Sequence, residues 1–229
     1  MRASHPISDH FDGQRFFNPG GGNPRGLGAL LRWQLGRKQG AWPAWVANTA
    51  SPKLPATLAP RECAVTFVNH ATFLIQFAEL NVLTDPIWSE RCSPVSWAGP
   101  KRVCAPGLTF ESLPRIDLVL LSHNHYDHLD LPTLRRLHSA QRPLIITTLG
   151  NRAFLAREGV DHAVELDWWR HHEPRPGVKV TVTPAQHFSA RGVTDRMATL
   201  WGGFVLETPV GRIYFAGDSG YFAGFKSIG

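Results

Sequence analysis

Three histidines and two aspartates lie within residues 122–130, which read Ser-His-Asn-His-Tyr-Asp-His-Leu-Asp. Buried imidazoles and carboxylates are costly to group unless a cation holds them together. In an extended segment alternate side chains share a face, so His123 and His125 point the same way, while Asp127 and His128 lie at the turn into a helix. Because these ligand types suit zinc, manganese or iron, the spacing predicts a metal site, with a solvated histidine-rich loop as the alternative.

Two more polar residues follow predicted strands further along the chain. His187 ends "VKVTVTPAQH" and Asp218 ends "RIYFAGD". Taken alone, His187 is a surface or capping histidine and Asp218 a turn former beside Gly217. Together with residues 122–130 they supply a third nitrogen for one ion and a carboxylate that bridges two ions.

Short apolar segments from residue 63 onward must position these groups. The segment 116–122, "IDLVLLS", is almost unbroken in its apolarity, as in a strand buried on both faces. A helix is expected from residue 131, with Asp130 as its N-cap and Pro132 in its first turn, and Gly159 ends a second helix that starts at residue 151. Strands that first meander and then alternate with helices predict an α/β sandwich. The remaining expected strands are 64–68, 72–77, 81–85, 143–148, 163–169, 178–185, 202–208 and 212–218.

Residues 1–60 are expected to form a basic arm rich in Gly and Pro, and residues 61–229 the folded domain. The arm carries seven Arg and Lys against Asp9 and Asp12, or +5 of the net charge of +6. Inside it, residues 26–38 predict a short amphipathic helix, which packs on its own domain or lies on a membrane surface. The face of that helix is formed by Leu27, Leu30, Leu31 and Leu35.

The overall composition is that of a globular protein. The 229 residues suffice for one large domain, and no apolar stretch approaches the ~20 residues that cross a bilayer. The first residues lack the apolar core of a signal peptide, so a cytoplasmic protein is expected, with possible contact at the inner face of the membrane through the arm. The three cysteines form no C-x-x-C pair and are expected to be reduced bystanders. Nucleic acid is not expected as a partner, because no basic patch with interleaved aromatic residues lies near the histidine motif.

The motifs "HNHYDHLD", "PAQHFSARG", "LWGGF" and "YFAGDSGYF" resemble the metallo-β-lactamase superfamily. More narrowly, they are similar to the branch that contains N-acylphosphatidylethanolamine-hydrolysing phospholipase D and its bacterial relatives. The resemblance runs from about residue 62 to the end and implies an αββα sandwich. It also implies a metal-dependent phosphodiesterase that attacks a lipid phosphodiester through a metal-bound hydroxide held by one or two Zn²⁺ ions, with Mn or Fe as alternatives.

The resemblance also assigns roles to residues. His123, His125 and His187 would hold the first ion, whereas Asp127 and His128, the expected catalytic residues, would serve the second, with Asp218 bridging. Three further residues would support the site or line its pocket. Asp85 would orient a ligand histidine, although it is also a plain Asp-Pro turn former. His70 is a pocket residue or a structural histidine, and Tyr126 marks the branch.

In these relatives the chain continues well beyond the "GDSGY" motif, up to a final histidine of the second metal position. The sandwich is therefore expected to be incomplete at its C-terminus, and the second ion to bind weakly. His138, His162, His171 and His172 lie in no motif that replaces that histidine. A lactonase-type metal hydrolase and a truncated, non-catalytic metal-binding fragment remain the alternatives to the phosphodiesterase.

Overall fold

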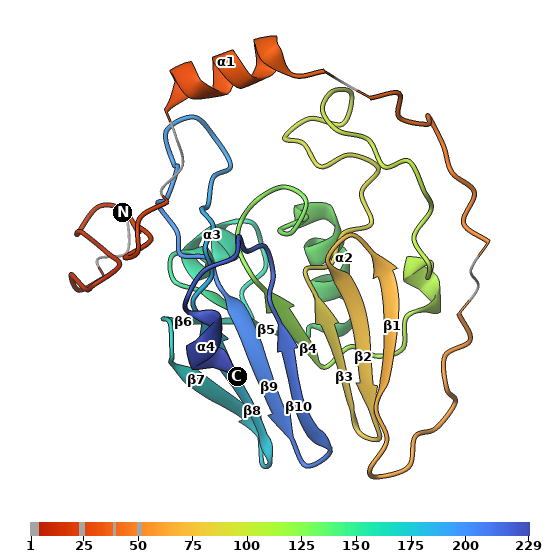
Figure 1. Ribbon diagram of the computed structural model, residues 1–229. Helices are drawn as coiled ribbons and strands as arrows, with labels where there is room; N and C mark the ends of the chain where they lie inside the picture. Colours follow the sequence, from red (N-terminus) through yellow and green to blue (C-terminus); the bar gives the residue numbers. More distant parts are fainter. Residues whose placement is uncertain (1–4, 23–25, 39, 50–51) are drawn as a thin grey trace.

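Two β-sheets face each other in the computed structural model, which describes residues 5–22, 26–38, 40–49 and 52–229 (Figure 1). Six strands form the first sheet in the order of the chain; β1, β2 and β3 are antiparallel, and β3 to β6 run parallel. Its strands are β1 (Ala64–Asn69), β2 (Thr72–Phe77), β3 (Leu80–Thr84), β4 (Leu118–Leu121), β5 (Leu144–Thr148) and β6 (Ala163–Leu166).

The second sheet is an antiparallel meander in the order β10-β9-β8-β7. Its strands are β7 (His171–Arg175), β8 (Val178–Thr183), β9 (Gly203–Thr208) and β10 (Gly211–Phe215). The helices are α1 (Leu27–Gly36), α2 (Leu131–Gln141), α3 (Asn151–Arg157) and α4 (Phe225–Ile228), with one 3₁₀ turn at Phe110–Ser112.

Alternation along β4 divides the apolar residues between two cores. Leu118 and Leu120 pack between the sheets, against residues of β8 and β9 such as Val180 and Phe204. Val119 and Leu121 point to the other side and pack against α2 and α3. Because both faces are covered, β4 needs apolar residues at every position, and this explains the unbroken apolar segment. The α/β sandwich predicted from the sequence is thereby confirmed.

The strand β7 was not expected from the sequence. Its residues, His-His-Glu-Pro-Arg, contain a proline and few apolar side chains. Such a segment is tolerated at the edge of a sheet, where one side needs no ladder of hydrogen bonds, and β7 is the edge next to β8.

Asp130 occupies the N-cap position of α2, and Pro132 lies in the first turn, but the expected capping bond is absent. The carboxylate of Asp130 instead accepts hydrogen bonds from the Ser89 hydroxyl at 2.7 Å and the Thr133 hydroxyl at 2.6 Å. It therefore fastens the loop after β3 to the start of α2.

The first 60 residues contain two stretches with different environments. Phe11 and Phe16 are buried in the core between the sheets. In contrast, Leu31, Trp33 and Leu35 of α1 are exposed, and Figure 1 shows α1 drawn clear of both sheets. The side chains of Leu27 and Leu30, and residues Arg2 and Arg25 of the basic arm, lie outside the described residues. No helix in the described part of the chain has the length and apolarity to cross a membrane.

Candidate metal centre

The predicted ligands, and Asp85 that was expected to orient one of them, come from the ends of four strands. Asp85 follows β3, the 122–130 segment follows β4, His187 follows β8 and Asp218 follows β10. Since β3 and β4 are parallel neighbours, Asp85 and Ser122 meet directly, and the Ser122 amide donates to Asp85 Oδ1 at 2.7 Å. The two sheets bring the other two strand ends to the same place.

Three imidazoles converge in the first cluster. His125 Nδ1 lies 2.8 Å from His123 Nε2 and 3.2 Å from His187 Nε2. Two nitrogens bound to a tetrahedral zinc are roughly 3.3 Å apart, so the spacing is close to that of a ligand set. Burial lowers the pKa of all three histidines, that of His123 well below its usual range and that of His187 to about 4. Neutral imidazoles keep the lone pairs that metal ions bind.

Asp85 orients two of the histidines from behind. Its Oδ2 lies 2.6 Å from His128 Nδ1 and accepts from the Ser122 hydroxyl at 2.5 Å, and that hydroxyl lies 2.9 Å from His123 Nδ1. Each Nδ1 therefore donates towards Asp85 or Ser122, and this leaves the Nε2 atoms of His123 and of His128 facing the site. Asp85 has a positive φ of 31°, which is unusual for a residue other than glycine, and these bonds hold it there.

The second cluster contains His70, Asp127 and His128, whose ligand atoms all lie within 4.8 Å of one another. His128 is completely buried, and its Nε2 has no hydrogen-bond partner although two carboxylates lie near it. Asp218 Oδ2 is 3.4 Å from this nitrogen and Asp127 Oδ2 is 3.9 Å away. Burial opposes a charge on His128, but the carboxylates of Asp85, Asp218 and Asp127 outweigh it and raise the pKa to about 10. The cluster thus favours a positive charge at this point, which a proton or a metal ion can supply.

Asp218 lies between the two clusters. Its Oδ2 is 3.4 Å from His128 Nε2 and 3.7 Å from His187 Nε2. Gly217, with φ of 59°, lets the chain pass close to Ser122, because a Cβ there would come within 2.7 Å of the Ser122 Cβ. The Gly220 amide also donates to the Gln186 carbonyl at 2.9 Å, so the segments that carry Asp218 and His187 are joined.

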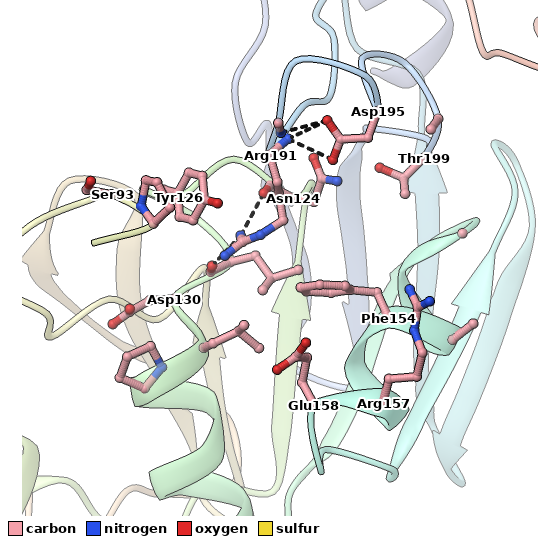
Figure 2. A pocket seen from close by; sticks show the side chains of 18 of the residues that line it. Ser93, Asn124, Tyr126, Asp130, Phe154, Arg157, Glu158, Arg191, Asp195 and Thr199 are labelled. Atoms are coloured by element: carbon pink, nitrogen blue, oxygen red, sulfur yellow. Dashed lines mark hydrogen bonds between the residues drawn. The ribbon is translucent and has the colours of Figure 1, made fainter. Parts of the chain in front are cut away.

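Arg191 was not singled out from the sequence, yet it ties two ligand loops together (Figure 2). Its guanidinium donates to the carbonyls of Asn124 at 2.9 Å and Leu129 at 2.8 Å, near the two ends of the histidine motif. It also stacks on the Tyr126 ring, with 4.0 Å from Cζ to the centroid. The only feature of the sequence that could have indicated Arg191 is its position four residues after His187.

Tyr126 faces away from the histidine clusters. Together with Asn124, Phe154 and Arg191 it lines a pocket of about 1360 Å³, which none of the predicted ligands lines (Figure 2). Residues 125–128 form a turn in which the His128 and Leu129 amides donate to the His125 carbonyl, and this turn sends the side chains of His125 and His128 to the clusters and those of Tyr126 and Leu129 to the pocket.

Asn18 is a second residue that the sequence did not reveal. It is buried, and its side-chain amide donates to the carbonyl of His187 at 2.9 Å. The neighbouring Gly21 carbonyl accepts from the Gln186 side chain at 2.7 Å. The N-terminal segment therefore supports the backbone of a candidate ligand, a contact over 169 residues that has no local signature.

The other histidines lie apart from the candidate ligands in the described structure. His138 faces Asp161, with 3.2 Å between Nε2 and Oδ1. His162 lies near the carbonyls of Arg142 and Pro143. His171 and His172 belong to β7.

Two facing sheets with a histidine and aspartate cluster at the strand ends define a class of α/β proteins suited to bind metal ions. Residues 80–229 match the family model described as the beta-lactamase superfamily domain, and the chain belongs to that family. The fold is also that of a metallo hydrolase from the archaeon Ignicoccus hospitalis, with a TM-score of 0.53 and 22% identity, over 73% of this chain and 65% of that one.

Sequence relatives place the chain near one branch of the family. It is 40% identical over 203 residues to an uncharacterised protein of Mycobacterium tuberculosis, covering 87% of this chain and 54% of the relative. It is 34% identical over 174 residues to N-acyl-phosphatidylethanolamine-hydrolyzing phospholipase D 1 of Caenorhabditis elegans, covering 72% of this chain and 49% of the relative. The chain thus spans about half the length of these curated relatives, and the predicted relationship to the superfamily and to this branch is confirmed.

Proposed function

We propose that this protein is a metal-dependent hydrolase that cleaves phosphodiesters of N-acylphosphatidylethanolamine-like lipids. The observation that carries the proposal is the convergence of three neutral imidazole nitrogens beside a buried histidine whose Nε2 is aimed at two carboxylates. This donor set fits one or two borderline divalent cations, with Zn²⁺ as the first choice and Mn or Fe as alternatives.

His123, His125 and His187 would bind the first cation, and Asp127 and His128 would serve the second, with Asp218 between them. Bound divalent cations supply Lewis acidity and lower the pKa of water at the site. The role of Asp85 is to fix the ring orientations of His128 and, through Ser122, of His123. Arg191 and Asn18 hold the backbone of the ligand loops in place.

The lipid substrate is inferred from the relatives. The Caenorhabditis elegans protein and a mitochondrial protein of Saccharomyces cerevisiae, 35% identical over 146 residues, are both named as phospholipases D that hydrolyse N-acyl-phosphatidylethanolamine. A phosphodiester bears a negative charge, and the cluster favours positive charge at its centre, so substrate and bound cations are complementary.

Contact with an anionic membrane is a further part of this proposal. The exposed apolar side chains of Leu31, Trp33 and Leu35 on α1 are followed by exposed Trp42 and Trp45. Three basic residues stand beside them, namely Arg32, Arg37 and Lys38, all exposed. Apolar and basic side chains on one segment are typical of helices that lie at a lipid surface.

The test is to measure metal content and turnover on the same purified protein. We expect bound transition metal and release of phosphatidic acid from N-acylphosphatidylethanolamine in mixed micelles. Turnover should fall about 10- to 100-fold in Asp85→Ala and at least as much in His187→Ala, because both changes weaken metal binding. Metal binding with hydrolysis of lactones but not of phosphodiesters would support the lactonase alternative. Metal binding without any turnover would support a non-catalytic metal-binding chain.

A further inference from the structure

We propose that the pocket lined by Asn124, Tyr126, Phe154 and Arg191 binds an amphiphile with one anionic head group, a carboxylate or a phosphate ester. None of the candidate metal ligands lines this pocket, so it is a second site, separate from the metal centre. Its volume of about 1360 Å³ exceeds the ~300–1,000 Å³ of ordinary small-molecule sites and leaves room for an elongated ligand.

The walls of the pocket come from parts of the chain that are far apart in the sequence. Phe11 comes from the N-terminal segment, and Arg91 from the loop after β3. Figure 2 shows Phe154 and Arg157 of α3 and Arg191 of the loop after β8 with their side chains at this pocket. The tertiary fold therefore gathers several arginines around one space.

The positive charge of the pocket is not balanced by ion pairs. Of its four arginines, Arg135 pairs with Glu158. In the described part of the chain no carboxylate lies within ion-pair distance of the other three, Arg91, Arg157 and Arg191. Guanidinium groups bind carboxylates and phosphates through paired hydrogen bonds, so these three arginines favour an anionic ligand.

The remaining acidic side chains of the pocket already have partners. Glu90 pairs with Lys101 at 2.6 Å. Asp130 accepts hydrogen bonds from two hydroxyls, and Asp195 accepts them from main-chain amides. Because burial lowers the pKa of Arg191, an anion beside its guanidinium would stabilise the charged form.

Two residues that line the pocket carry a buried polar atom with no hydrogen-bond partner. Asn124 is only 4% exposed, and its Oδ1 has no partner among the described residues. The same holds for Oγ1 of Thr199. Unpartnered buried polar atoms are rare in folded proteins, and two of them at one pocket indicate that a bound molecule belongs there.

Apolar side chains at the pocket favour a ligand with an apolar body. Leu129, Leu131 and Phe154 line it together with Val95. Charged and apolar walls meet directly, since Arg191 Cζ lies 5.2 Å from the centroid of the Phe154 ring. An inorganic anion would use only the arginines, whereas an anionic amphiphile uses both kinds of wall.

The experiment is isothermal titration calorimetry of the full chain with decanoate and with decyl phosphate, each below its micelle-forming concentration. Decanol and inorganic phosphate are the control ligands, because each has only one half of the amphiphile. The test variant is Arg157→Gln. Arg152→Gln is its matched control, since Arg152 is an exposed arginine of the same helix that does not line the pocket.

We expect one decyl anion to bind per chain, and the tighter of the two identifies the head group. Decanol and inorganic phosphate should each bind at least about 10-fold more weakly, as should the anion in Arg157→Gln, because a charge-assisted hydrogen bond is lost. Arg152→Gln should bind within 2-fold of wild type.

Three results would overturn the site. The first is no binding of either anion, and the second is equal affinity for decanol and the anions. The third is an Arg157→Gln variant that binds as wild type while Leu35→Ser does not, which would place the amphiphile on α1. Binding that persists in His187→Ala supports the pocket, whereas its loss there would assign the anion to the metal centre. Because every readout is binding, the site stands or falls separately from the proposed hydrolase activity.

Discussion

Two stretches of the first 60 residues are alike in composition and opposite in environment. Residues 8–22 and residues 27–46 both contain glycine, proline, arginine and large apolar side chains. In the first, Phe16 is 1% exposed between the sheets, whereas in the second Leu35 is 88% exposed. Apolar content alone therefore does not decide which stretch joins the core.

The difference lies in the polar anchors of the first stretch. His10 lies between Asp9 and Asp167, with its Nε2 2.7 Å from Asp167 Oδ1, and it stacks on Trp168 at 4.4 Å. Asn18 bonds to the His187 backbone. These contacts hold residues 8–22 against the domain and join them to the backbone of His187, a candidate metal ligand.

The largest expected effect is a difference in the free energy of unfolding between variants of the two stretches. Phe16→Ala should lower the free energy of unfolding by about 3–5 kcal/mol, because it leaves a cavity in the core. Leu35→Ala, at an exposed position, should change it by no more than about 0.5 kcal/mol. Urea denaturation of the two variants measures both values, and equal losses would contradict the comparison.

The second prediction concerns the link to the metal centre. Asn18→Ala should weaken Zn²⁺ binding about 10-fold, since outer partners of ligand residues typically contribute this much to affinity. Asn48→Ala is the control, because Asn48, just beyond residues 27–46, makes a similar bond to a main-chain carbonyl, that of Ala105 at 3.1 Å. A competition titration with a chromophoric chelator measures the affinity, and identical affinities for both variants would show that residues 8–22 do not support the site.

The third prediction is a pH dependence of the His10 anchor. Burial lowers the pKa of His10, but the hydrogen bonds to Asp167 and Asp9 outweigh it and raise the pKa above its usual value. The protonated His10 therefore contributes its full stabilisation at pH values below its ordinary pKa of about 6.5. This stabilisation is lost as the pH rises through the raised pKa. Towards acid it is lost as Asp167, whose pKa is lowered, becomes protonated.

Unfolding at several pH values tests the anchor. His10→Gln should cost about 1 kcal/mol at pH 6 and less at pH 9. Asp9→Asn should cost less than Asp167→Asn, because the Asp9 side chain is 85% exposed and solvent screens its charge. A cost of His10→Gln that grows with pH would contradict the protonated pairing.

The smallest expected effect concerns residues 27–46. Leu35→Ser and Trp42→Ser should leave stability unchanged but reduce binding to vesicles with anionic lipid a few-fold each, since each removes apolar surface available to the interface. Vesicle sedimentation measures this. His162→Ser, away from the stretch, is the control, and equal binding of all variants would count against a lipid surface as the partner.

The strong local patterns in the sequence predicted most of the domain. The unbroken apolar segment 116–122 predicted β4, and the positions of Pro and Gly predicted the ends of the helices α2 and α3. The H-x-H-x-D-H spacing predicted residues that the structure brings together. The strand β7 could not be predicted, because its stability comes from pairing with β8 rather than from its own side chains. The carboxylate of Asp130 was assigned a capping role from position alone, whereas its side-chain partners are the Thr133 hydroxyl and, from a distant loop, the Ser89 hydroxyl.

The sequence by itself determined which residues could bind a cation and which strands carry apolar side chains on both faces. Ligand chemistry and the alternation of side chains along a strand are local properties. Tertiary structure decided that His70 faces Asp127, that Arg191 spans the histidine motif and that Asn18 supports His187. These contacts join residues that lie from 57 to 169 positions apart in the sequence. Strand order within the first sheet and the packing of the two sheets on each other set such distances, and no periodicity along the chain records them.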